Sequence, residues 1–124
     1  YQGGDGGEQV SDNRREALEA LRDDINAGKP FTVGMCMGAF PKGYSLAYKA
    51  DRGSIDAAKE LHDAVLPGWH FNVATEANRQ GFYATVSPKQ WGKSFVACSE
   101  TPARAWLLSI LSALISETPK GETP

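Results

Sequence analysis

The most regular pattern of apolar positions lies near the C-terminus, in residues 101–116, which we expect to form a helix ending at Ser116. Thr101 is a typical N-cap, and Pro102 is a typical first helical residue. Leu108 and Ile115 lie outside the main apolar face, so more than one neighbour must cover the helix. The cover is either a sheet with another helix or a sheet with a second subunit. The main face, at i, i+3 and i+4 spacing, consists of Trp106, Leu107, Ile110, Leu111 and Leu114.

Two further stretches have a helical period. In the first, Asn13 is the expected N-cap, Glu16 completes a capping box and Gly28 ends the helix. In the second, Ser54 is the expected N-cap and residues 67–68, Pro-Gly, end the helix. The first helix has a narrow apolar stripe and should lie at the periphery. The two stripes are Leu18, Leu21 and Ile25, then Ile55, Ala58, Leu61 and Val65.

A period of two predicts five strands. Residues 31–38 and 44–49 predict a hairpin, and the small residues Gly34, Cys36 and Gly38 on one side of it indicate close packing. Residues 69–73, 82–86 and 94–98 predict an antiparallel meander, because their connections are too short for a parallel crossover. The predicted class is therefore α+β, an antiparallel sheet packed by helices in an α/β sandwich. The predicted order is α-β-β-α-β-β-β-α.

Length and composition indicate one domain in the 124 residues. Residues 1–12 are predicted to be a flexible leader, in part a remnant of a cleaved expression tag. Residues 13–116 should form a single α+β domain, and residues 117–124 a flexible polar tail.

The formal net charge of −2 excludes the strong basic excess of a general nucleic-acid binder and the strong acidic excess of a DNA mimic. No segment reaches the roughly 18 apolar residues of a membrane span, and no signal-peptide pattern is found, so we expect a cytoplasmic location. Cys36 and Cys98 are expected to be buried reduced thiols rather than a bridge.

The sequence contains little that predicts catalysis. His62 and His70 are its two histidines, and no pair of ligands at zinc-site spacing occurs. We interpret His62 as a surface residue of its helix and His70 as a residue on the polar side of a strand. The alternative is a metal site of both histidines with a carboxylate. We predict that the protein is not an enzyme and uses neither metal nor cofactor.

Aromatic side chains beside cations are the candidate binding residues. Trp91 lies between Lys89 and Lys93 in a loop, and Tyr83 lies on the strand face opposite Phe82. Such aromatics stack on bases or anchor a protein partner. The alternative is that Trp91 folds back over the end of the sheet.

Two segments resemble the phage ABA sandwich domain family of small phage and prophage proteins. Residues 53–73, GSIDAAKELHDAVLPGWHFNV, resemble its "SLDAAxxLxPxGW" stretch, and residues 99–116 are similar to its late "ATPALALCAALLRAL" helix. The departures are the extra residues 62–65, and an N-terminal helix and hairpin that the family often lacks. The resemblance implies an α/β sandwich and a phage or prophage origin, and it implies no activity. The matching positions are Ser54, Ile55, Asp56, Ala57, Ala58, Leu66, Pro67, Gly68, Trp69, Thr101, Pro102 and Ala103.

We therefore expect a small non-enzymatic phage or prophage accessory protein that binds a host or phage protein, for example to blunt a host defence system. A homodimer through residues 101–116 is a further expectation. The alternative is an RNA- or DNA-binding module, because from Ser54 onward the order α-β-β-β-α is that of a double-stranded-RNA-binding domain. That fold starts its last helix with a lysine cluster, whereas this chain has only Glu100 and Arg104 there.

Overall fold

A computed structural model describes residues 3–29, 33–41, 43–75, 81–88 and 93–117. The element order is α-α-α-α-β-β-β-α. The helices are α1 (Gly3–Asn26), α2 (Val33–Ala39), α3 (Tyr44–Asp51), α4 (Ile55–Val65) and α5 (Pro102–Glu117), and the strands are β1 (His70–Thr75), β2 (Phe82–Ser87) and β3 (Phe95–Ser99). The predicted α+β class is confirmed. The predicted order of elements, α-β-β-α-β-β-β-α, is wrong, because helices stand where the first two strands were expected.

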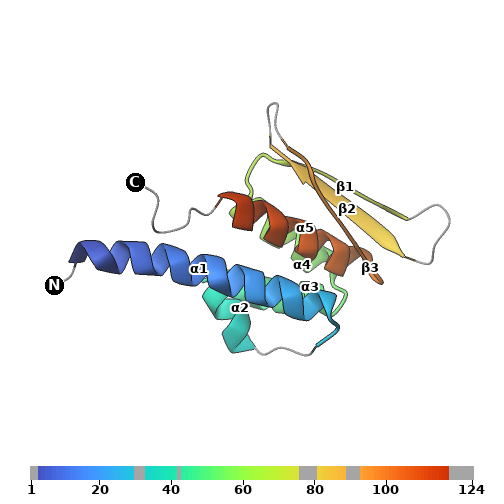
Figure 1. The fold of residues 1–124 in the computed structure, drawn as a ribbon. Helices are drawn as coiled ribbons and strands as arrows, with labels where there is room; N and C mark the ends of the chain where they lie inside the picture. Colours follow the sequence, from blue (N-terminus) through green and yellow to red (C-terminus); the bar gives the residue numbers. More distant parts are fainter. Residues whose placement is uncertain (1–2, 30–32, 42, 76–80, 89–92, 118–124) are drawn as a thin grey trace.

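Helix α5 forms the centre of the fold. The sheet packs on one side of α5, and α1, α3 and α4 pack on its other sides (Figure 1). Leu108 and Ile115, which lie off the main apolar face, are only 3% and 6% exposed. The sequence-based expectation of cover from more than one side is confirmed, and the cover is a sheet with helices of the same chain. These two side chains therefore give no reason to place a second copy on α5.

The sheet is a three-stranded antiparallel meander in the order β1-β2-β3. Its register pairs Val73 with Ala84, and Ala84 with Ala97. Because side chains alternate between faces, Phe71, Val86 and their alternate neighbours point toward α5. The predicted meander is confirmed.

The predicted hairpin in residues 31–49 is wrong, because residues 33–39 form α2 and residues 44–51 form α3. Cys36, Ala39 and Phe40 are buried at i, i+3 and i+4, which is helical spacing, whereas Met37 is 50% exposed. Segments of seven and eight residues fit a period of two and a helical period almost equally well. The small residues still mark a close approach, since a Cβ on Gly38 would lie 3.4 Å from Ala17 of α1.

The predicted helix ends are mostly confirmed. Ser54 Oγ accepts a hydrogen bond from the Ala57 amide at 3.2 Å, and Thr101 Oγ1 accepts one from the Arg104 amide at 3.1 Å. Gly28 adopts a φ of +73° after the end of α1, a conformation that favours glycine. The predicted N-cap at Asn13 is wrong, because α1 begins at Gly3 and takes in most of the segment expected as a leader. The expected tail, residues 118–124, lies outside the described residues.

In the described part of the chain no helix is long and apolar enough to cross a membrane.

Candidate functional site

The predicted binding residues are spread along the β2–β3 hairpin. Tyr83 is half-buried near the start of β2, on the face turned away from α5, and Lys93 is exposed before β3. Tyr83 pairs with Cys98 at the far end of β3, so roughly 13 Å or more of strand separates it from Lys93. Lys89 and Trp91 lie outside the described residues. The structure does not bring Tyr83 and Lys93 together.

A broader surface surrounds Tyr83, and we call it the outer sheet face. It is the side of the sheet opposite α5, and no described helix covers it (Figure 1). Thr85 and Val96 are paired across its middle, and Val96 is 62% exposed. The residues of this face are His70, Asn72, Ala74, Tyr83, Thr85, Ser87, Val96 and Cys98.

None of these residues is an aspartate, glutamate, lysine or arginine, although 23% of the chain is charged. The cores of protein–protein interfaces are depleted of charge and enriched in tyrosine. A surface that holds nucleic acid needs cations to meet phosphates. The outer sheet face shares the depletion of charge with interface cores, and its described residues include no lysine or arginine that could meet a phosphate. Tyr83 is the one member of this set that the sequence predicted as a binding residue, because the position of α5 decides which face of the sheet stays open.

His62 is buried, so its expected position on the helix surface is wrong. Its Nδ1 accepts the indole N–H of Trp106 at 3.2 Å, and its Nε2 lies 3.0 Å from the Trp69 carbonyl oxygen. A carbonyl oxygen only accepts, so Nε2 carries the proton. Both ring nitrogens are occupied, and neither can ligate a metal or remove a proton from a substrate. His70 is exposed on the outer sheet face, as predicted.

Metal-ligating residues do not gather elsewhere in the described residues. Within them, no group of three or more histidine, cysteine, aspartate or glutamate side chains could hold a metal ion. The absence of enzymatic activity, metal and cofactor stays a prediction.

Cys36 and Cys98 are not joined in a disulfide, and they lie in different surroundings. Cys36 is fully buried in α2, and burial together with the charge of Asp51 raises the pKa of its thiol from 9.0 to about 11. It is therefore protonated near neutral pH and is a poor nucleophile. Cys98 is exposed, which contradicts the expectation of a buried thiol, because nothing in the described chain covers the outer sheet face.

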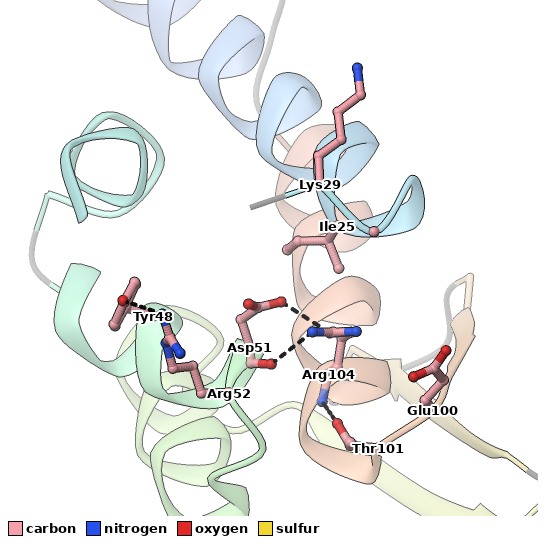
Figure 2. A pocket seen from close by; sticks show the side chains of 9 residues that line it. Ile25, Lys29, Tyr48, Asp51, Arg52, Glu100, Thr101 and Arg104 are labelled. Carbon is pink, nitrogen blue, oxygen red and sulfur yellow. Dashed lines mark hydrogen bonds and ion pairs between the residues drawn. The ribbon is translucent and has the colours of Figure 1, made fainter. Parts of the chain in front are cut away.

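A polar pocket of about 410 Å³ lies where α1 and α3 end and α5 begins (Figure 2). At its centre Arg104 Nε lies 3.0 Å from Asp51 Oδ1, and an Arg104 terminal nitrogen donates to the Asp51 carbonyl oxygen at 3.2 Å. Arg52 donates to the Tyr48 hydroxyl at 2.7 Å and stacks over its ring.

The charges in this pocket largely compensate one another. Asp51 neutralises Arg104, and the remaining charged lining residues are Lys29, Arg52 and Glu100. The pocket brings together neither a nucleophile with a base nor a group of cations free to hold phosphate. Its central ion pair joins α3 to α5. Arg104, the one cation at the start of α5, is engaged in this pair.

Comparison with models of known protein families gives no match, and no curated protein and no solved structure matches the chain. The resemblance to the phage ABA sandwich family thus stays a prediction from its two motifs.

Proposed function

We propose that this chain is a non-enzymatic protein-binding domain and that its partner contacts the outer sheet face. The observation that carries the proposal is the lack of any aspartate, glutamate, lysine or arginine among the described residues of the outer sheet face, which no described helix covers. Exposed strands normally carry charges that discourage association. Their absence here, beside Tyr83 and the exposed Val96, favours contact with an uncharged protein surface.

Nucleic-acid binding, the alternative from the sequence, is less well supported. The start of α5 offers Arg104 alone, and this guanidinium is already engaged by Asp51. A double-stranded-RNA-binding domain would place several lysines there. We propose a host or phage protein as the partner and the host cytoplasm as the site of action. We also propose a phage or prophage role, action against a host defence and an α/β sandwich. The phage or prophage origin and the sandwich rest on the family resemblance, which implies no activity.

The test is affinity capture from bacterial lysate with and without nuclease, using the full chain and a double variant, Thr85→Lys with Val96→Glu. These residues pair across β2 and β3, so opposite charges keep the sheet paired while placing charge in the middle of the face. We expect a nuclease-resistant partner that the double variant loses.

The matched control is Ala20→Lys with Ser45→Glu, which adds the same two charges at exposed positions of α1 and α3, helices that lie on the other side of α5 from the sheet (Figure 1). This control should retain the partner. Recovery of only nuclease-sensitive material, or equal loss in both variants, would refute the proposal. A duplex RNA titrated over a range of salt concentrations tests the alternative, since phosphate-driven binding weakens steeply with salt.

A further inference from the structure

Strand β1 is an unprotected edge of the sheet. It is the first strand in the order β1-β2-β3, and no described strand pairs with its outer side. Its sequence, HFNVAT, contains no aspartate, glutamate, lysine, arginine or proline. Natural proteins use charged residues and proline on edge strands to block pairing with another chain, and β1 has neither.

Exposed apolar side chains flank this edge on the helix side. Phe71 of β1 is 44% exposed, and its ring is held in place by stacking on Trp106 at 4.5 Å between centroids. Lys59 of α4 lies over the same ring at 5.7 Å, and Ile55, one turn before Lys59, is 41% exposed. At the other edge of the sheet, Phe95 and Ala97 of β3 are half-buried on the corresponding face. The β1 edge is therefore the one that leaves apolar surface uncovered beside free strand backbone.

We propose that β1 pairs antiparallel with β1 of a second copy of this chain, so that the two sheets become continuous. An antiparallel pair of identical strands has a twofold axis, and each residue near the axis meets its own copy. A charge there would face a like charge, which destabilises a sheet. The uncharged sequence of β1 removes that obstacle.

The alternation of the strand restricts the register. Opposed residues must lie on the same face, so the twofold axis passes through a single residue, Asn72 or Val73, and not between them. With the axis at Asn72, each Phe71 lies opposite Val73 of the other copy on the face toward α5. That register pairs two apolar residues twice, so it is the one we assign.

Area also favours a second copy, and this step depends on the proposed function. Strands about 4.8 Å apart, with residues rising about 3.3 Å each, give one outer sheet face roughly 10–15 Å by 15–20 Å. This is well below the roughly 800 Å² that each partner contributes to a standard interface. Joining two sheets through β1 doubles the continuous uncharged face that a partner could contact.

The first experiment is light scattering of the full chain across a concentration series. We expect a dimer that Asn72→Lys converts to a monomer with an unchanged circular dichroism spectrum. Thr85→Lys is the matched control, because it places the same charge on the same face but in the central strand. It should remain a dimer. A monomer at every concentration, or a dimer that persists in Asn72→Lys, overturns the proposal.

The second experiment tests the register and does not depend on how Asn72→Lys folds. In a Cys98→Ser background, Asn72→Cys should form a disulfide-linked dimer on mild oxidation, whereas Ala74→Cys, which lies opposite His70 of the other copy, should not. Cross-linking of Ala74→Cys alone, or a disulfide that forms only when the Asn72→Cys and Ala74→Cys proteins are mixed, overturns the assigned register, because an axis at Val73 places Asn72 opposite Ala74. No cross-linking in any of these samples overturns the interface. Loss of the captured partner in Thr85→Lys with Val96→Glu, without loss of the dimer, separates the outer sheet face from the β1 edge.

Discussion

The indole N–H of Trp106 donates a hydrogen bond to Nδ1 of His62 across 3.2 Å, and both side chains are buried. The same imidazole contacts the Trp69 carbonyl oxygen through Nε2 at 3.0 Å. The imidazole thus links α4 to α5 and to the residue just before β1. Phe71 packs edge-on against it at 5.1 Å between centroids. His62 is the polar centre of the contact between helices and sheet.

Replacing His62 with leucine should destabilise the protein by about 2–4 kcal/mol. The substitution leaves the Trp106 indole N–H and the Trp69 carbonyl without partners, and each buried unsatisfied group costs about 1–3 kcal/mol. Urea denaturation at neutral pH measures the change. His70→Leu is the matched control, because His70 is exposed and should change the free energy of unfolding by less than about 0.5 kcal/mol. Equal effects of the two substitutions would contradict the role given to His62.

Trp106→Ala should cost more, about 3–5 kcal/mol, since it removes both a buried aromatic ring and a hydrogen bond. Trp106 is 3% exposed and contacts residues from α4 and β1. Trp69→Ala is a suitable comparison, because Trp69 is only partly buried against the core, and it should cost less. A thermal melt of Trp106→Ala that stays close to the wild type would show that the core lies elsewhere.

Several features of this fold could be predicted from the sequence because they depend on local chemistry. The N-caps Ser54 and Thr101 precede strong helical stripes, and the connections between the three strands are too short for anything but an antiparallel meander. The wide apolar arc of α5 correctly indicated cover on several sides. Each signal involves neighbours within a few residues.

The incorrect predictions concern positions whose role depends on distant packing. Residues 33–39 form a helix because Cys36, Ala39 and Phe40 face a core that only the tertiary fold creates. His62 follows Leu61, and both are buried because α4 contacts α3 as well as α5. The outer sheet face is open because α5 packs against the opposite face of the sheet. The sequence alone indicates alternation but does not indicate which side is covered.

Breaking the ion pair between Arg104 and Asp51 should loosen the junction of α3 and α5. The two side chains are 28% and 18% exposed, so solvent screens them only in part. We expect Arg104→Ala to cost about 1–2 kcal/mol, because it leaves the Asp51 carboxylate and carbonyl without this donor. Asp63→Ala is the control, since its pair with Lys59 is exposed and should contribute about 0.3–0.5 kcal/mol. An Arg104→Ala effect no larger than that of Asp63→Ala would show that the pair is unimportant for stability.

The Cys36 thiol predicts a loss of stability at alkaline pH. Burial and the nearby Asp51 charge raise its pKa to about 11, from an ordinary value of 9.0. Between these values the unfolded chain releases the thiol proton while the folded chain retains it, so unfolding becomes more favourable as the pH rises. The contribution of this thiol to the free energy of unfolding is complete below pH 9. One pKa unit corresponds to about 1.36 kcal/mol, so about 2–3 kcal/mol of stability should be lost by pH 11.

Urea denaturation at several pH values between 7 and 11 measures the dependence of the free energy of unfolding on pH. Cys36→Ala should flatten that slope, whereas Cys98→Ala, at an exposed thiol, should leave it parallel to the wild type. A slope that Cys36→Ala leaves unchanged would assign the alkaline loss to other groups, because no thiol would then remain at that position to titrate.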